Sequence, residues 1–478
     1  MKLKALLQDV ETKSVYTFNP DITNVSDNTD KIRQNGLFVC VRGEKTDGHL
    51  FARKALERGA AVIICDHDIG ISNSVIVEDT RKAYALISAR FYGSCHRKMK
   101  IIGVTGTNGK TTVSYLIRKI LEDSGCKTGL IGTVNVIIGK EKYPADLTTP
   151  DPVDLHRYLM LMQIAGCQAC VMEVSSQALC QDRVYGINFE CSVFTNLTAE
   201  HLDYHNTMQD YAKAKQQLFE SSKISVINAD DAYASQMLEA ACGEKLTYST
   251  SDFSDYSASD IRLTRSGVTY KLKTKKSEYN VSYDCIGVFS VYNSMAAIAV
   301  ADAIGANTDK AVRSVARFDG IIGRMERVEN SFGINIIIDY AHTPDSLMNA
   351  LTTLRALYDG RLITVFGCGG DRDKSKRPEM GRVATRFSDF VFVTSDNPRN
   401  ENPESIINDI VNGIPKEKYF RITDRKLAIK SALYSAKAGD TVLIAGKGHE
   451  KYQILGTQKI YFNEREIIKK LLEDKARF

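Results

Sequence analysis

Short apolar runs alternate along this chain with longer segments in which apolar residues recur every three or four positions. A short apolar run is typical of a strand buried on both faces, and the three-to-four repeat predicts a helix. In residues 1–98 the pattern predicts strands at 37–41, 60–65 and 74–77, and helices near 51–58 and 80–92. We therefore expect a small α/β domain over residues 1–98, ending in a basic linker at 93–98.

Residues 99–324 continue the pattern on a larger scale, with buried strands predicted at 101–104, 169–174, 191–195 and 224–227. Residues 245–285 differ, because they are rich in Ser, Thr, Tyr and Asp and alternate polar with apolar positions. This alternation predicts antiparallel strands at the side of the sheet. We expect a central α/β domain with an antiparallel side sheet.

After residue 324 the pattern starts again, with apolar strands predicted at 334–339, 362–367, 390–394 and 441–446. Strands separated by helical segments predict a doubly wound, Rossmann-like third domain over residues 325–478. In such a sheet the functional loops lie at the carboxyl ends of the strands. Polar residues gather at those ends, at 339–342, 367–372, 396–399 and 446–450.

The composition agrees with three domains of a globular enzyme. The chain has 478 residues, 43% hydrophobic and 25% charged, and about 150 residues per domain is usual. A net charge of +5 is too small to indicate a nucleic-acid partner. No apolar run approaches the ~20 residues of a spanning helix, so we expect no membrane insertion and a cytoplasmic location.

The eleven cysteines predict reduced thiols within the core. They are scattered, and many lie inside apolar runs. An odd number in a large chain argues against a disulfide framework. Cys167 and Cys170 have the spacing of a metal or redox pair, but without a second pair or nearby histidines we expect neither role.

A glycine-rich turn joins the strand at 101–104 to a periodic helix, and it predicts a nucleotide triphosphate site. Glycines allow successive N–H groups to face phosphate oxygens, a lysine adds charge, and a threonine hydroxyl can bind Mg²⁺. The alternative is a glycine turn without a ligand, which the order of strand, Gly-Lys-Thr and helix disfavours. Val104 stands where the usual pattern has glycine, so the spacing is unusual. The residues of the turn are Gly106, Thr107, Asn108, Gly109, Lys110, Thr111 and Thr112.

Two further segments carry candidate metal ligands. Glu173 ends a predicted strand, where a carboxylate could bind Mg²⁺, although Ser175 and Ser176 can also cap the next helix. His201, with Asp203 and His205, could indicate zinc. We favour Mg²⁺, with one histidine completing a mixed set of ligands, because hard cations prefer oxygen.

Lys215 and a charged loop offer two more candidates. Lys215 shares the apolar side of a predicted helix with Tyr211 and Phe219, which is unusual for a lysine unless its head reaches solvent; the sequence leaves both interpretations open. The loop at 371–377, together with Arg399, could bind a zwitterionic or dicarboxylic molecule through arginine. A solvated run of charges is the usual alternative.

Taken together, these motifs resemble the Mur ligases of peptidoglycan synthesis over nearly the whole chain. The resemblance rests on the segments 106–112, 173–179, 195–205, 323–326, 339–345, 369–373, 396–399 and 446–450. It implies an ATP-dependent amide ligase, in which ATP phosphorylates a peptide carboxylate and an amine then attacks the acyl phosphate. The implied pathway supports cell-wall growth, cell shape and cell division.

The resemblance also implies residue roles around the nucleotide. Lys110 would hold the ATP phosphates, Thr111 and Glu173 would bind Mg²⁺, and His201 would bind a second Mg²⁺. Lys215 matches the lysine that this family carbamylates, which would turn it into a further metal ligand. Three residues match positions near the adenine nucleotide: Asn293, Arg324 and His342. The implied catalytic residues are Lys110, His201, Lys215 and Arg324.

The implied substrates are a UDP-N-acetylmuramoyl dipeptide, ATP and an amino acid. Thr148, Thr149, Ser175, Gln181 and Arg183 match positions that bind the muramoyl dipeptide. Asp396, Asn397, Pro398 and Arg399 resemble the version of the family that selects meso-diaminopimelate, because an arginine suits its extra carboxylate and would repel lysine. The remaining positions that match contacts of this amino acid are Arg372, Gly446 and Glu450.

One segment departs from the family. Members usually carry Asp-Ser-Arg in the first domain, whereas this chain has Ser26, Asp27 and Asn28. Asn28 can still hydrogen-bond to the uridine nucleotide, but without the arginine charge, and the turn at 43–48 is expected to line the same pocket.

Several alternatives stay open at this point. The chain could add L-lysine instead of meso-diaminopimelate, and more distantly it could be a folylpolyglutamate synthetase-like ligase or a nucleotide switch that forms no amide. We expect a monomer.

Overall fold

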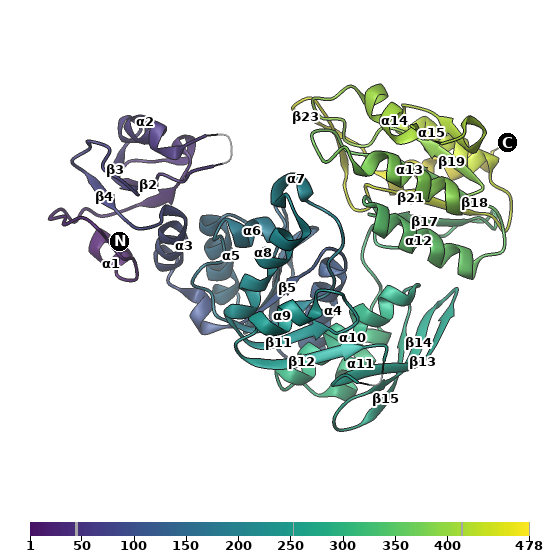
Figure 1. Ribbon diagram of the computed structural model, residues 1–478, viewed down its shortest axis with the longest axis horizontal. Helices are drawn as coiled ribbons and strands as arrows, with labels where there is room; N and C mark the ends of the chain where they lie inside the picture. The colour runs from purple at the N-terminus through teal and green to yellow at the C-terminus, as the bar shows by residue number, and fades with distance from the viewer. Residues whose placement is uncertain (44–45, 252, 413, 478) are drawn as a thin grey trace.

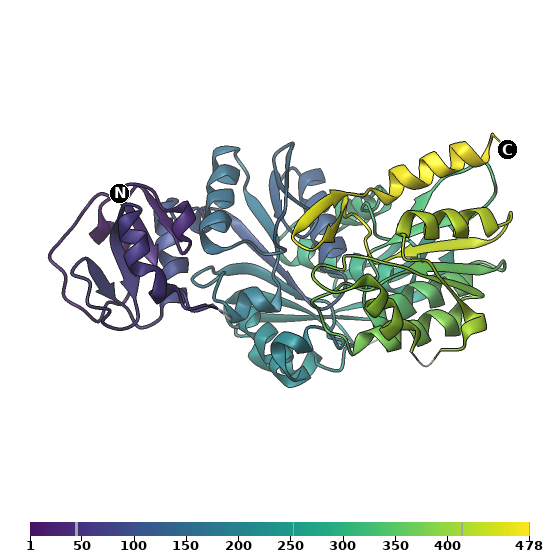
Figure 2. The ribbon, with the colours of Figure 1, turned by 90° about the horizontal axis from the view of Figure 1, so that it is seen from above.

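The computed structural model of the chain describes residues 1–43, 46–251, 253–412 and 414–477. Three main sheets and a two-stranded hairpin follow one another along the chain. In both views the first sheet lies toward the left end of the molecule and the third toward the right (Figure 1, Figure 2). None of the helices in the described ranges combines the length and apolar composition that a bilayer-spanning helix requires.

The first sheet is small, parallel and covered on both faces, as the alternating pattern predicted. Its order is β1-β2-β3-β4, and its strands are β1 (Asn24–Ser26), β2 (Gly36–Val39), β3 (Ala60–Cys65) and β4 (Ser74–Ile76). The α-helices are α1 (Leu3–Leu6), α2 (Ala52–Glu57) and α3 (Thr80–Phe91), and the 3₁₀ helices are η1 (Thr29–Lys31), η2 (Gly48–Phe51) and η3 (Cys95–Lys98). The segment expected to be a linker is thus partly helical, and it buries Cys95 and His96.

The central sheet has eleven strands in the order β15-β14-β13-β12-β11-β10-β5-β9-β6-β7-β8. Its parallel part consists of β5 (Lys100–Thr105), β6 (Thr128–Ile131), β9 (Ala169–Glu173), β10 (Phe189–Phe194), β11 (Ser222–Asn228) and β12 (Glu244–Ser249). At one edge, β13 (Tyr256–Thr264) pairs parallel with β12 and antiparallel with β14 (Gly267–Lys273), which pairs antiparallel with β15 (Glu278–Tyr283). At the other edge, β6 continues antiparallel into β7 (Asn135–Ile138) and β8 (Glu141–Pro144).

The expectation of antiparallel strands over 245–285 is therefore correct for β13 to β15 and wrong for β12. The helix α9 (Ala234–Ala240) lies between β11 and β12, and a helical crossover returns the chain parallel to the previous strand. The β6–β8 extension was not predicted. Every residue of β8 is exposed, so no buried alternation marks it in the sequence.

Helices cover both faces of the central sheet. One core cluster contains residues of α4 (Lys110–Asp123), α10 (Val288–Ala303) and α11 (Thr308–Ala316). The other contains residues of α5 (Pro152–Ile164), α6 (Ser176–Cys180), α8 (Met208–Glu220) and α9. The short helix α7 (Leu202–His205) precedes α8.

The third sheet is doubly wound, as predicted. Its order is β16-β17-β21-β18-β19-β20, with only β16 antiparallel among these described strands: β16 (Glu326–Val328), β17 (Asn335–Asp339), β18 (Leu362–Phe366), β19 (Phe390–Val393), β20 (Tyr419–Arg421) and β21 (Thr441–Ala445). One core cluster contains α12 (Pro344–Leu357), α13 (Lys376–Phe387) and α14 (Pro403–Val411). The other contains α15 (Arg425–Ser435) and α16 (Glu464–Lys475).

Two small elements complete this unit, the 3₁₀ helix η4 (Lys416–Lys418) and the hairpin of β22 (Tyr452–Leu455) and β23 (Gln458–Tyr461). Each main sheet falls within one of the predicted ranges 1–98, 99–324 and 325–478. The boundaries themselves stay a prediction.

The order of the central strands brings three predicted motifs to one edge. β5 lies between β9 and β10, all three are parallel, and Val104 pairs with Glu173 while Thr105 pairs with Phe194. The glycine turn, Glu173 and the segment after Phe194 therefore leave the sheet side by side, at its carboxyl edge.

Candidate active site

The glycine turn follows β5 and leads into α4, as expected for a phosphate loop. Gly106 has φ +146°, and a Cβ there would lie 1.9 Å from the Thr195 hydroxyl. Gly109 has φ +86°, and a Cβ there would meet the Asn293 side-chain oxygen at 2.6 Å. Both glycines are therefore required by backbone conformation and by close neighbours.

The segment after β10 holds this loop in shape. The backbone N–H of Thr107 donates to the Asn196 carbonyl at 2.8 Å, and that of Asn108 donates to the Asn196 side chain at 2.9 Å. The Thr195 hydroxyl donates to the Asn108 carbonyl at 2.6 Å. Lys110 folds over the loop, and its Nζ donates to the carbonyls of Gly106 and Thr107 at 2.9 and 2.8 Å.

Glu173 ends β9 fully buried and faces the start of α4. Its Oε2 accepts hydrogen bonds from the hydroxyls of Thr111 at 3.0 Å and Thr133 at 2.8 Å, and Oε1 accepts from the Thr133 N–H at 3.0 Å. A buried carboxylate beside a threonine hydroxyl offers the oxygen donors that Mg²⁺ prefers. Thr133 was not predicted, because a lone threonine after β6 carries no distinctive signal. The Ser175 hydroxyl caps α6, so the capping interpretation of this segment also holds.

A second group of predicted residues lies next to Glu173. The Thr148 hydroxyl is 3.0 Å from that of Thr133, and the Thr149 hydroxyl donates to the Glu173 carbonyl at 2.8 Å. Thr149 also accepts the Ser175 N–H at 3.0 Å, and its carbonyl accepts from Arg183 at 2.8 Å. Arg183 in turn donates to Gln181 at 2.7 Å. The structure thus brings together all five residues expected to bind the muramoyl dipeptide, while their contact with it stays a prediction.

Lys215 lies inside the protein, on α8. Its side chain is 1% exposed, so the alternative that its head reaches solvent is wrong. Nζ donates to the Gly106 carbonyl at 3.0 Å and lies 4.6 Å from the centre of the Tyr211 ring. Burial and the nearby charge of Lys110 hold the pKa of Lys215 well below its usual value, which favours the neutral amine.

His201 precedes α7 with φ +57°. Burial and the charges of Lys110 and Lys215 lower its pKa to about 4, so its ring is a neutral potential ligand. His205 does not join it, because its Nε2 lies 2.8 Å from the Ser176 hydroxyl. This arrangement gives no support to a zinc site made by both histidines.

Glu200 is a site residue that the sequence analysis missed. Its Oε1 lies 3.0 Å from His342 Nε2, and its Oε2 lies 3.8 Å from His201 Nε2. Burial raises the pKa of Glu200, but the hydrogen bond from His342 and the charges around it lower the pKa more, to well below the usual range. Its position in the sequence, directly before the candidate ligand His201, could have indicated that it belongs to the site.

Residues from α10 and the third unit surround the same loop. Asn293 touches Gly109, as described above, and Arg324 Nη2 lies 3.4 Å from the Thr111 hydroxyl with its guanidinium 4.5 Å from the Tyr340 ring centre. The Asn108 side chain donates to Asp345 at 3.0 Å. All three residues predicted near the nucleotide, Asn293, Arg324 and His342, therefore lie around the loop or its neighbours.

A separate polar cluster lies at the carboxyl edge of the third sheet. Asn397 donates to Glu450 at 2.9 Å, and the buried Lys447 donates to both of them at 2.9 Å. A Cβ on Gly446 would lie 2.9 Å from Asp396 Oδ2, which is buried and accepts no hydrogen bond from the described residues. Lys447 was not predicted individually, because lysines rarely lie buried.

Arg399 lies beside this cluster after Pro398, at φ +51°. Its Nη1 donates to the Gly370 carbonyl at 2.7 Å. Burial and the charge of Arg372 lower the pKa of Arg399. Two neighbouring guanidiniums that disfavour each other's charge form a site where an anionic group would be stabilised.

Arg377 does not belong to this candidate binding loop. It is fully buried and makes ion pairs with Glu401 at 2.8 Å and Asp409 at 2.9 Å. It therefore fixes α13 against α14 rather than facing a ligand. The grouping of Arg377 with its charged neighbours was wrong because its partners are distant in the sequence.

In the first unit, Asn28 caps η1. Its side-chain oxygen accepts the Asp30 N–H at 2.8 Å. Of the turn at 43–48, Glu44 and Lys45 lie outside the described residues. Contact of Asn28 or of this turn with a uridine nucleotide stays a prediction.

Comparisons with known proteins agree with these features. The Mur ligase middle domain matches residues 104–301, the Mur ligase glutamate ligase domain matches 323–448, and the Mur ligase family catalytic domain matches 21–92. The chain is 44% identical to the UDP-N-acetylmuramoyl-L-alanyl-D-glutamate--2,6-diaminopimelate ligase of Caldanaerobacter subterraneus, covering 99% of both chains. It is 42% identical to a relative of that name, ligase 1, in Clostridium acetobutylicum, covering 99% of this chain and 100% of that one.

A solved structure also resembles this chain over its whole length. It is titled as the structure of a UDP-N-acetylmuramoyl-L-alanyl-D-glutamate--2,6-diaminopimelate ligase and is 33% identical, with a TM-score of 0.72, covering 100% of this chain and 99% of that one. Three family domains in order, full-length relatives and a shared three-sheet fold agree with the phosphate loop and its surroundings. The chain therefore belongs to the Mur ligase family, whose members are ATP-dependent ligases.

Proposed function

We propose that this protein joins meso-diaminopimelate to the γ-carboxylate of D-glutamate in UDP-N-acetylmuramoyl-L-alanyl-D-glutamate, using ATP. The observation that carries this proposal is that Arg399 lies beside Asn397 and Glu450 in this chain. The full-length relatives of the chain are named as 2,6-diaminopimelate ligases. Arg399 and Arg372 suit a carboxylate, whereas Glu450 suits an ammonium. Meso-diaminopimelate carries both groups at its distal stereocentre, and L-lysine carries only the ammonium.

The loop residues act first, on ATP. Lys110 and the N–H groups of the loop bind the phosphates, and Asn293, Arg324 and His342 lie where they can contact the rest of the nucleotide. The substrate carboxylate attacks the γ-phosphorus, ADP leaves, and an acyl phosphate remains. The amine of diaminopimelate then attacks the acyl carbon, phosphate leaves with its electron pair, and the amine proton passes to a base.

The residues beside the loop fit a magnesium ion. Thr111 and Glu173 offer a buried hydroxyl and carboxylate 3.0 Å apart, and His201 offers a neutral nitrogen. When bound, Mg²⁺ would neutralise negative charge on the phosphates. We assign Thr111 and Glu173 to hold this ion, and His201 to hold a second Mg²⁺.

Lys215 would supply a further ligand as its carbamate. Its depressed pKa favours the neutral amine, which adds to the carbon of CO₂ and releases one proton to give a carboxylate-like group. That conversion would place an anion beside the Lys110 ammonium, where the neutral amine carries no charge. The attraction between the two opposite charges would help to offset the cost of burying them.

The muramoyl dipeptide would lie against Thr148, Thr149, Ser175, Gln181 and Arg183, next to Glu173. Arg183 supplies a cation for its acidic groups. Asn28 would contribute from the first unit. The acceptor carboxylate would then lie on the same side of the sheet as the phosphate loop.

One assay tests the proposal. ADP release is measured with the muramoyl dipeptide and, in turn, meso-diaminopimelate, L-lysine or no amino acid, and the product is identified by mass. We expect turnover and an amide product with meso-diaminopimelate. Faster turnover with L-lysine would make the chain a lysine-adding ligase, and ADP release without an amide would overturn the ligase proposal.

A further inference from the structure

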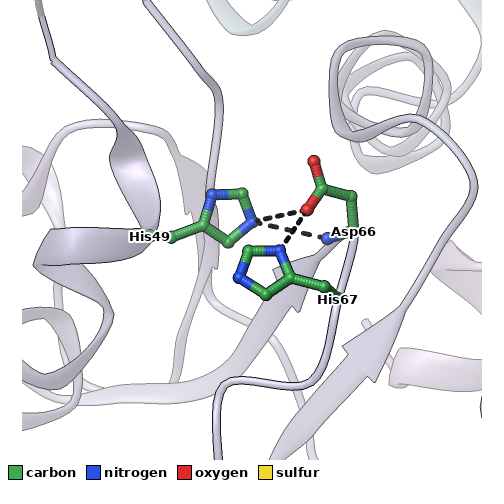
Figure 3. A group of neighbouring side chains, drawn as sticks. All are labelled: His49, Asp66 and His67. Atoms are coloured by element: carbon green, nitrogen blue, oxygen red, sulfur yellow. Dashed lines mark hydrogen bonds and ion pairs between the residues drawn. The ribbon is translucent and has the colours of Figure 1, made fainter.

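Two histidines and a carboxylate of the first unit converge at the end of β3, away from the phosphate loop. His49 belongs to η2, and Asp66 and His67 follow β3 directly. Figure 3 shows the two imidazole rings facing the Asp66 carboxylate. One ligand atom of each residue lies within 4.8 Å of the others. His49 Nε2 is 3.3 Å, and His67 Nδ1 is 2.5 Å, from the same Asp66 oxygen.

A second carboxylate fixes the orientation of His49. Asp47 Oδ1 lies 2.6 Å from His49 Nδ1, and the backbone N–H of Asp66 points to His49 Nε2 at 3.4 Å. Together these contacts favour the tautomer in which Nδ1–H donates to Asp47 and Nε2 keeps its lone pair. A histidine whose other nitrogen donates to a carboxylate is the usual form of a metal-ligating histidine.

We propose that His49, Asp66 and His67 bind a divalent transition metal ion, Zn²⁺ in particular. Two imidazole nitrogens and one carboxylate form a common ligand set for zinc, whereas Mg²⁺ and Ca²⁺ prefer oxygen. Tetrahedral ligands about 2.0–2.1 Å from zinc lie about 3.3 Å from one another, which is the separation of His49 Nε2 and Asp66 Oδ1. A small movement of the exposed His67 would bring its nitrogen to that separation.

Arg42 is the one cation paired with these carboxylates within the described residues. Its Nη2 lies 3.2 Å from Asp66 Oδ1 and its Nε lies 3.7 Å from Asp47 Oδ2. The Arg42 side chain is 59% exposed, so it can turn into solvent at little cost. Two carboxylates and one guanidinium leave a local charge of −1, which attracts a dication.

The metal ion would join two segments that are separate in the sequence. His49 lies on η2, after the turn at 43–48, and the other two ligands lie on the chain leaving β3. Binding would therefore stabilise the folded first unit by mass action. Three ligands leave a fourth position open to water.

Zinc binding to the full-length protein tests this site. Equilibrium dialysis in excess Mg²⁺ compares the wild type with His67→Ala and Asp66→Asn. The matched control is Asp68→Asn, an exposed carboxylate two residues from Asp66 that, within the described residues, accepts a hydrogen bond only from the Gly70 N–H. We expect the wild type and the control to bind one Zn²⁺ more than the two ligand variants. Equal binding by all four proteins would overturn the proposal.

Asp47→Asn gives an independent test. Loss of the carboxylate that orients His49 should weaken Zn²⁺ binding about tenfold to hundredfold. Co²⁺ in place of Zn²⁺ should give a tetrahedral absorption spectrum in the wild type and lose it in His67→Ala. An unchanged affinity in Asp47→Asn, together with an unchanged Co²⁺ spectrum in His67→Ala, would show that the ion binds elsewhere.

Discussion

At the scale of single residues, Lys215 is the most unusual placement in the site. A lysine is almost never fully buried without a paired charge. Here its Nζ donates to the Gly106 carbonyl, and the charge of the nearby Lys110 lowers its pKa. The sequence showed that Lys215 shares a helix face with Tyr211 and Phe219. It could not show whether the head reaches solvent, because that depends on how α8 packs against β5.

Lys215→Ala should abolish most ligase activity. Losing the proposed carbamate ligand, and with it the charge that it would place near the phosphates, should cost about 100-fold or more in kcat. Lys213→Ala, on the exposed side of the same helix, is the matched control and should keep wild-type activity. NMR of the wild type in isotopically labelled bicarbonate should show a carbamate signal that Lys215→Ala lacks. Retained activity in Lys215→Ala would refute the assigned role.

Arg399→Ala should lose preference for meso-diaminopimelate. Truncating one partner of a half-buried charge pair costs about 2 to 5 kcal/mol, and the loss should appear in kcat/KM for meso-diaminopimelate but not for L-lysine. Arg382→Ala, an exposed arginine on α13, is the control and should change neither value. Equal losses for both amino acids would mean that Arg399 acts on stability rather than on selection.

The sequence indicated which residues lie together where a motif fixed their position, and it missed contacts between residues that are distant along the chain, while the roles of these residues stay predictions. The glycine loop and Glu173 were located because they lie at the end of recognisable strands, whereas the group around Thr149 came from the family resemblance alone. Glu200 was missed, because its significance depends on His342, 142 residues later. Arg377 was placed in a binding loop, because nothing local reveals its partners, Glu401 before α14 and Asp409 on it.

At the scale of elements, apolar runs located most of the buried strands to within about two residues. The missed strands β8 and β23 are exposed along their whole length. β6 and β7 were missed although they are largely buried, because each is only four residues long. The parallel pairing of β12 was also missed. Alternating polar and apolar residues indicate that one face of a strand is buried, but they do not indicate the direction of the strand. The segment 93–98 was expected to be a linker, yet η3 packs against α5 and buries His96 beside His156.

Two buried histidines, His96 of η3 and His156 of α5, should make the protein less stable in acid. The rings of His96 and His156 lie 5.3 Å apart, with no hydrogen-bond partner among the described residues. Burial lowers the pKa of His96 to about 4 and that of His156 to about 3. The unfolded chain binds protons below pH ~6.5 that the folded chain does not, so stability falls as the pH drops from ~6.5 toward these values.

His156→Phe should reduce that loss. At pH 5 each buried histidine costs about 2 kcal/mol of stability relative to neutral pH, and phenylalanine keeps a ring without titrating. Urea unfolding at pH 7 and pH 5 measures the difference. Tyr158→Phe, a nearby ring on α5, should keep the wild-type pH dependence. The same dependence in His156→Phe would mean that this junction does not control the response to acid.

At the scale of the whole molecule, the proposed site is divided between two units. The loop, Glu173 and Lys215 belong to the central unit, whereas Arg324 begins the passage to the third unit, which carries His342 and Arg399. Within the site, two hydrogen bonds of 3.0 Å join described residues of the two sides, Asn108 to Asp345 and Glu200 to His342. A nucleotide bound at the loop would therefore contact residues on both sides, and binding would be coupled to how the units approach each other.

A double-mutant cycle measures that coupling. Glu200→Ala and His342→Ala should each lower kcat/KM for ATP, because each leaves a buried partner without its hydrogen bond. Since the two side chains contact each other, their combined effect should differ from the sum by about 0.5 to 3 kcal/mol. Glu200→Ala combined with Arg382→Ala is the control and should be additive within about 0.5 kcal/mol. Additive effects in the first cycle would mean that the two units act independently on ATP, and that the bond between them is not part of the working site.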